Sequence, residues 1–359
     1  MEKNKNINKI KDIVFVFLFI FFIALIFVFN YTVNPYCIFK FPEIKGFNNI
    51  KIHKLTSKRS VIFSDFKLNA KGKEIAFVGN CLFEDLGLGL DNVIFATIPM
   101  VKPSETFKII KVLHETAPSI KKIYLGVAFD ELWNDKNDEI TDELPEWESN
   151  NINYKDIINL LFSWNTTKYS IETVKASMEN RGEEQHFVHP YKEIGKKEYN
   201  TGFSLSILDT IKEIIEYTKA NNIDLIVYYS PVHVSKKIHI YEKGQWNNNL
   251  KFKKQLALIT PFYDYSLFNG YNHFPLDENS KYFIDNLHMT KIYNNMILKD
   301  ILSDNKKYGQ LITSNNVNQI SNEDTKKLED YIKANKELSE VIKNATAKDV
   351  DIKIPSKIY

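Results

Sequence analysis

The strongest hydrophobic feature of the chain is an unbroken apolar run near the N-terminus, IVFVFLFIFFIALIFVF, at residues 13–29. As an α-helix, its 17 residues span about 26 Å, close to the thickness of the hydrocarbon core of a bilayer. The following sequence, NYTVNPY, contains no small-x-small cleavage site, so the pattern favours an uncleaved anchor over residues 13–30. A cleaved signal peptide and a buried core helix are the alternatives.

Positive charges before this run predict the orientation of the anchor. Four lysines lie there: Lys3, Lys5, Lys9 and Lys11. Because lysines are retained on the cytoplasmic side, residues 1–12 are predicted to stay in the cytoplasm. The rest of the chain then lies on the outer face of the cytoplasmic membrane, beginning with a membrane-proximal lead-in at residues 31–73.

Beyond the lead-in, short apolar runs alternate with amphipathic segments. Five runs predict strands, at residues 74–79, 92–99, 121–129, 223–231 and, more weakly, 259–266. Their apolar residues are continuous rather than alternating, which is typical of strands buried on both faces of a parallel sheet. Four segments with helical spacing predict helices, at residues 104–117, 204–222, 245–258 and 289–302. The fold class predicted is α/β, a three-layer sandwich with a mostly parallel five-stranded sheet after one transmembrane helix.

The alternation defines an α/β domain over residues 74–303, interrupted between residues 131 and 201. The interruption is too long for a plain crossover between two strands. We therefore interpret residues 131–201 as an insertion that covers one edge of a site. The stretch IINLLFSWNTTKYSIETVKASM within it predicts one or two short helices. Residues 304–359 are polar and predict a helical tail, in which Ser321 and Asp324 are spaced like a capping box.

Composition excludes several classes of function. The net charge of +2, without a basic stripe interleaved with aromatics, gives no reason to expect nucleic acid. Two cysteines are too few for a disulfide framework, although a bridge between Cys37 and Cys81 stays open. The chain lacks a glycine-rich phosphate loop, a CxxC pair and an HExxH motif, and nothing around His186 and His189 completes a zinc site. We therefore expect no metal and no cofactor.

Candidate chemistry lies where strands end. Cys81 follows the first predicted strand, and Asp285 and His288 form a D-x-x-H block before the last predicted helix. Ligands of open parallel sheets bind beyond the carboxyl ends of the strands, so these residues are expected on one rim. There, His288 could act as a general base oriented by Asp285, and it would lower the pKa of a nucleophilic Cys81 thiol. A small buried cysteine, with Asp285 and His288 in local hydrogen bonds, is the plainer alternative.

Weaker candidates surround this rim. Three residues near strand ends could contact substrate or an oxyanion: Asn80, Asp130 and His233. Solvation is the ordinary role for Asp130, and a satisfied loop histidine is the ordinary role for His233. Three tryptophans of the insertion could stack on sugar rings, pack in a core or contact lipid: Trp133, Trp147 and Trp164.

The order of these motifs resembles the SGNH/GDSL hydrolase superfamily, whose nucleophile turn reads G-[DNST]-S and whose late block reads D-x-x-H. Here GNC at residues 79–81 stands at the first position and DNLH at residues 285–288 at the second. The N-terminal span followed by NPY is similar in layout to the membrane-anchored bacterial branch of the superfamily, which includes polysaccharide O-acetylation and D-alanyl-teichoic acid export proteins. The resemblance covers residues 31–315.

The resemblance implies a membrane-anchored acyl esterase or acyltransferase that acts on cell-envelope glycan or a related acyl ester. Cys81 would replace the serine nucleophile, Asp285 would orient the base, and His288 would be the base. A membrane-bound O-acyltransferase is the implied partner. The asparagine donor of the family's G-x-N-D block is missing, because the third strand ends GVAFDE, and losing one oxyanion donor costs roughly 3–4 kcal/mol.

This departure leaves two further interpretations open. The domain could be catalytically degenerate and serve as a glycan-binding or partner-docking module. A catalytic serine elsewhere, in a simple esterase, is the third possibility.

Overall fold

The computed structural model of the 359-residue chain describes residues 2–36, 38–39, 41–49, 66–79, 90–97, 101, 103–128, 154–179, 206–273, 281–283 and 286–344. Two compact units are present. The first combines residues 1–69 with residues 141–184, and the second combines residues 70–140 with residues 185–359.

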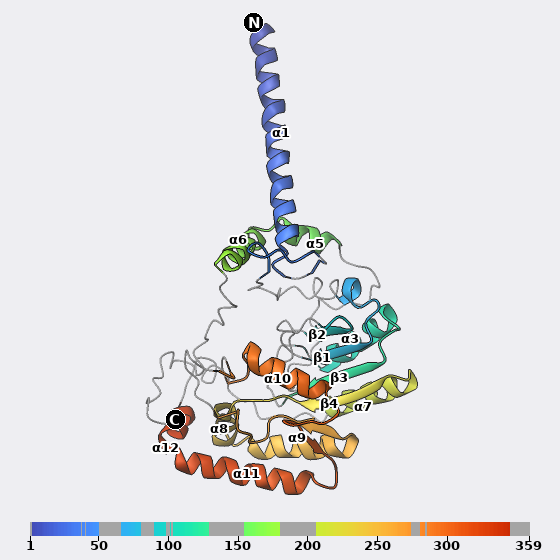
Figure 1. Cartoon of the computed structure of the whole chain (residues 1–359), viewed down its shortest axis with the longest axis vertical. Coiled ribbons are helices and arrows are strands. Elements are labelled where there is room, and N and C mark those ends of the chain that lie inside the picture. The colour runs from blue at the N-terminus through green and yellow to red at the C-terminus, as the bar shows by residue number, and fades with distance from the viewer. Residues whose placement is uncertain are drawn as a thin grey trace. The chain divides into compact units, whose positions relative to one another are not determined.

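The second unit is built on a six-stranded sheet with the order β2-β1-β3-β4-β5-β6 (Figure 1). The strands are β1 (Ile75–Gly79), β2 (Val93–Thr97), β3 (Lys122–Val127), β4 (Asp224–Tyr229), β5 (Phe262–Asp264) and β6 (Gln310–Ile312). Every neighbouring pair is parallel except β5 and β6, which are antiparallel. The α/β fold with a mostly parallel sheet is therefore confirmed, and each of the five predicted strands is part of it.

The sixth strand was not predicted. β6 has only three residues and lies in the segment interpreted as a polar helical tail. A pattern of three residues is too short to identify a strand, so only its pairing with β5 reveals it.

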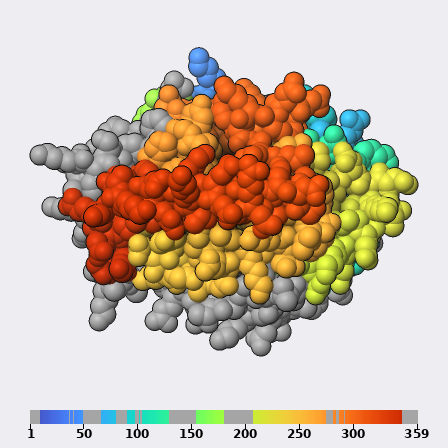
Figure 2. All heavy atoms as spheres, turned by 90° about the horizontal axis from the view of Figure 1, so that it is seen from below, coloured from blue at the N-terminus to red at the C-terminus, as the bar shows by residue number. Residues whose placement is uncertain are grey.

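The second unit also contains helices. They are α3 (Pro103–Thr116), α7 (Ser206–Ala220), α8 (Val234–Glu242), α9 (Trp246–Ile259), α10 (Lys291–Leu302), α11 (Val317–Ala334) and α12 (Lys336–Asn344). The four predicted helices correspond to α3, α7, α9 and α10, whereas α8 was missed. Figure 2 shows α11 running across one face of the unit, beside α9.

A row of stacked aromatic rings, centred on β1, lies in the core of this unit. The parallel register places Phe77 opposite Phe95 on β2 and opposite Tyr124 on β3. The rings stack, with centroids 5.0 Å and 4.7 Å apart respectively. Such cross-strand pairs stabilise a sheet beyond the area that they bury, so this row fixes the register of the three strands.

The first unit contains the N-terminal helix. α1 (Glu2–Val33) includes the segment Ile10–Val33, whose 24 residues are long and apolar enough to cross a membrane. α5 (Tyr154–Leu161) and α6 (Trp164–Met178) are the short helices predicted in the insertion, and they pack at the C-terminal end of α1 (Figure 1). The apolar helix is confirmed, and its most apolar window has no residue buried in the structure.

A carboxylate organises the turn that leads into β6. Asp300 at the end of α10 accepts hydrogen bonds from the backbone N–H groups of Lys307, Tyr308 and Gly309, and from the hydroxyl of Tyr265 at 2.9 Å. This arrangement presses Gly309 against the Tyr265 ring, so that a Cβ at Gly309 would overlap the ring.

We predict that Gly309→Ala lowers the free energy of unfolding by about 1–3 kcal/mol, because the buried ring must shift to admit the methyl group. Urea denaturation of the detergent-solubilised protein measures this change. Gly270→Ala is the matched control, since a Cβ there meets nothing within 4 Å. Equal stability of the two variants would contradict the prediction.

Candidate functional site

The candidate site lies at the carboxyl edge of the parallel strands. β1 ends at Gly79, β3 at Val127 and β4 at Tyr229, and parallel pairing brings these ends to one edge. In sheets of this kind, ligands bind beyond that edge. The segments that follow the strands therefore decide what the site contains.

The segment after β4 is joined to the loop that carries the D-x-x-H block. The backbone N–H of His233 donates to the carbonyl of Asn286 at 3.2 Å. The His233 ring also meets the Phe283 ring edge to face, with centroids 5.5 Å apart. Asn286 is the second residue of the DNLH block, and this residue lies beside the segment that follows β4.

The D-x-x-H loop is closed at its base. Phe283 and Met289 form an isolated antiparallel bridge. Thr290 donates from its backbone N–H to the Tyr282 carbonyl at 2.9 Å and from its hydroxyl to the Lys281 carbonyl at 2.7 Å. The same hydroxyl oxygen accepts from the N–H of Tyr293 and caps α10. Residues 286–290 are therefore held between the sheet edge and the start of α10, with His288 partly exposed.

His233 has a structural part in this arrangement. Its side chain is 1% exposed, and its Nδ1 accepts from the Ser235 N–H at 3.1 Å, which caps the N-terminus of α8. The Ser235 hydroxyl lies 2.8 Å from the same nitrogen. This environment fits the satisfied loop histidine that the sequence left open, and a substrate contact at His233 stays a prediction.

Four of the predicted site residues lie outside the described residues: Asn80, Cys81, Asp130 and Asp285. Of the six, the structure describes His233 and His288, and it brings their segments together through Asn286. Trp133 and Trp147 also lie outside the described residues, whereas Trp164 is 78% exposed at the start of α6.

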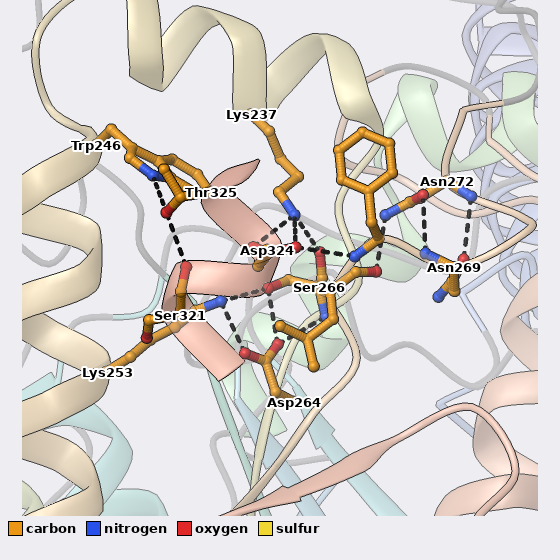
Figure 3. A network of polar contacts seen from close by, with 12 residues as sticks. Lys237, Trp246, Lys253, Asp264, Ser266, Asn269, Asn272, Ser321, Asp324 and Thr325 are labelled. Atoms are coloured by element: carbon orange, nitrogen blue, oxygen red, sulfur yellow. Dashed lines mark hydrogen bonds and ion pairs between the residues drawn. The ribbon is translucent and has the colours of Figure 1, made fainter. Parts of the chain in front are cut away.

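A buried ionic cluster next to this edge was missed by the sequence analysis (Figure 3). Lys237 of α8 contacts both carboxylate oxygens of Asp324 on α11, at 2.7 and 2.8 Å, and donates to the Ser266 carbonyl at 3.0 Å. Lys253 of α9 lies 2.7 Å from the carboxylate of Asp264 and 2.8 Å from the Ser266 hydroxyl. All five residues are buried, so the cluster supports the fold rather than receiving a substrate.

The cluster was missed because of the residue types in α8. Lys236 and Lys237 interrupt the apolar pattern of VSKKIHI, and both are buried in the structure. Lysine is almost never fully buried unless it is paired, and the sequence does not show that Asp324 pairs with it from 87 residues away. The capping-box interpretation of Asp324 assigned its carboxylate to the wrong partner. It instead accepts from the Phe268 N–H at 3.0 Å and from Lys237.

Electrostatics in the cluster favour the charged form of Asp324. Burial alone would raise the pKa of this carboxyl, but the positive charges of Lys237 and Lys253 and the hydrogen bonds that it accepts hold the pKa below its ordinary value. On the same helix as Lys237, burial lowers the pKa of His239 to about 3, and the charges of Lys236 and Lys243 act in the same direction.

Among the residues that the structure describes, no group of three His, Cys, Asp or Glu side chains could hold a metal ion. No family model, curated protein or solved structure matches the chain. The fold class therefore rests on the sheet itself, and membership of the SGNH superfamily stays a prediction from the motifs and their order.

We predict that Asp324→Asn costs roughly 3–5 kcal/mol of unfolding free energy, because it leaves the Lys237 charge buried without a counter-charge. Lys237→Met/Asp324→Asn removes both charges and keeps an oxygen that can accept from the Phe268 N–H. The double variant should therefore lose much less than the sum of the two single variants. Additive losses in urea denaturation would show that the two side chains do not act as a pair.

The buried His239 should make stability depend on pH. Its folded pKa of about 3 lies below the ordinary unfolded value of about 6.5, so between these values the unfolded chain binds the proton more readily. Stability is therefore full above the unfolded pKa and falls as the pH decreases toward 3, by up to about 1.4 kcal/mol per pH unit. We predict that His239→Gln flattens this slope between pH 6 and pH 4.5, measured by urea unfolding. An unchanged slope would contradict the assignment.

Proposed function

We propose that this chain is a membrane-anchored, SGNH-type acyl esterase or acyltransferase that acts on cell-envelope glycan or a related acyl ester. The hydrogen bond between the His233 N–H and the Asn286 carbonyl supports the proposal most strongly. It joins the D-x-x-H loop to the sheet edge at which β1 also ends. Cys81 follows the last residue of β1, Gly79, by two positions.

In the proposed reaction, His288 takes the proton from the Cys81 thiol while the sulfur attacks the acyl carbonyl carbon. Collapse of the tetrahedral intermediate breaks the ester C–O bond, and His288 returns the proton to the departing alcohol. Water or a glycan hydroxyl then attacks the thioester, again with His288 as the base. The C–S bond breaks, His288 returns the proton to the Cys81 sulfur, and the acid or the new ester is released. Asp285 orients the imidazole, and Asn80 is the proposed oxyanion donor. Asp130 and His233 border the substrate.

The proposal includes α1 as an uncleaved anchor. Asn30, near the C-terminal end of α1, is fully buried and donates to the Leu161 carbonyl at 2.7 Å and to the Thr167 hydroxyl at 3.0 Å. Cleavage between α1 and the rest of the chain would remove this side chain from the packed insertion helices. The lysines before the apolar run favour a cytoplasmic N-terminus, with the α/β domain on the outer face. A membrane-bound O-acyltransferase is the proposed partner and acyl source.

The catalytic test uses the full chain in detergent with 4-nitrophenyl acetate as the acyl donor. We predict an acetyl adduct on Cys81, detected by mass spectrometry, and turnover that falls about 10²–10⁴-fold in His288→Ala through loss of the general base. Cys81→Ala should abolish both signals. Cys37→Ala is the matched control, because it removes the other cysteine and should leave both signals unchanged.

Turnover at the wild-type rate in Cys81→Ala or His288→Ala would overturn the catalytic assignment. If the wild-type protein binds glycan without turnover, and its Cys81 does not react with small electrophiles, the domain is a binding or docking module instead.

A further inference from the structure

The two insertion helices expose large apolar side chains. Six residues of α5, α6 and the turn between them are 42–78% exposed: Tyr154, Ile158, Phe162, Trp164, Ile171 and Met178. The first three recur every four positions and therefore lie along one side of α5 and its C-terminal turn. Another face of α5 packs against the rest of the unit, since Ile157, Leu160 and Leu161 are buried. The exposed apolar residues therefore form a stripe on α5 that is separate from its buried face.

The position of this surface follows from its contact with α1. The Phe162 ring packs on the Phe27 ring with centroids 5.1 Å apart. Phe27 lies two residues, or about 3 Å along the helix, before the end of the apolar run at Phe29. If the apolar run fills the hydrocarbon core, Phe162 lies at the outer boundary of that core. Figure 1 shows α5 and α6 at the C-terminal end of α1, lying across its axis rather than along it.

The residue types suit the boundary between acyl chains and headgroups. Tyrosine and tryptophan are enriched at that level, because their rings are apolar and their edges polar. Trp164 is 78% exposed, and Tyr31 on α1 adds a second ring that packs on Phe39 at 4.8 Å. Exposed lysines accompany the apolar residues and could reach phosphate groups: Lys155, Lys168 and Lys175.

We propose that α5 and α6 lie in the outer interface of the bilayer that α1 spans, with the stripe from Tyr154 to Trp164 in contact with lipid. This inference rests on the anchor in the proposed function. Lipid is the occupant because the stripe continues directly from the membrane-spanning surface of α1 through the Phe27–Phe162 contact. The insertion therefore gives the protein a second, in-plane attachment to the membrane.

The test uses the full chain in vesicles made only of phosphatidylcholine and phosphatidylglycerol, with bromine atoms placed at shallow or deep positions of the acyl chains. Trp164→Phe should remove the larger part of the tryptophan quenching caused by shallow bromines. Trp246→Phe is the matched control, because Trp246 is 5% exposed and lies in the other unit, and it should leave that quenching unchanged.

Because no other protein is present in the vesicles, shallow quenching that depends on Trp164 identifies lipid as the occupant. Quenching equal in Trp164→Phe and wild type would overturn the proposal and favour a protein partner on this surface. Extraction with alkaline carbonate tests the anchor separately. Protein that resists extraction without Trp164-dependent quenching refutes only the interfacial placement, whereas protein released by carbonate refutes the anchor as well.

Discussion

The positions of the loops at the carboxyl edge of the sheet depend on two main-chain hydrogen bonds at the first turn of α8. The N–H of His233 donates to Asn286, and the N–H of Val234 donates to Asn272 at 2.6 Å. The first four N–H groups of a helix have no partner within the helix, so they must be satisfied from elsewhere when the helix start is buried. Here carbonyls from two distant loops satisfy the groups at the start of α8. Capping one helix thereby fixes the loop after β5 and the D-x-x-H loop at the end of β4.

The buried ionic cluster explains why α8 can hold this position. An ammonium group has three donors, and those of Lys237 are all used: two on Asp324 and one on the Ser266 carbonyl. A buried pair contributes little net stability, because removing two charges from water offsets most of their attraction. The pair does, however, raise the free energy of any arrangement in which Lys237 and Asp324 are separated. Lys237 and Asp324 therefore determine where α11 packs on α8 more than how stable the domain is.

Local sequence patterns were sufficient to predict the five parallel strands, but not the antiparallel strand β6 or the helix α8. The five parallel strands are continuous apolar runs, and burial on both faces makes that pattern unambiguous in the first four. β6 is defined by its pairing with β5, and α8 is capped by a histidine and carries buried lysines. Both depend on partners far away in the sequence, so no local window could reveal them. For the site, the sequence predicted the D-x-x-H loop at the strand edge, but it could not predict that Asn286 makes the connection.

The insertion shows the same limit on a longer scale. β3 and β4 are neighbours in the sheet, so the 96 residues between Val127 and Asp224 have to leave the sheet edge and return to it. Within these residues, α5 and α6 pack on α1, which lies more than a hundred positions earlier in the sequence. The side-chain amide of Asn30 on α1 donates to the carbonyl of Leu161. Asn34 has a left-handed backbone conformation, at φ 49°, and ends α1 just beyond this contact. Its side chain forms hydrogen bonds with the backbone of Ile38 and Phe39. The end of the apolar helix is therefore built as part of a folded unit. Within this unit the Asn30 side chain supplies a donor to the Leu161 carbonyl, and losing it would cost about 1–3 kcal/mol.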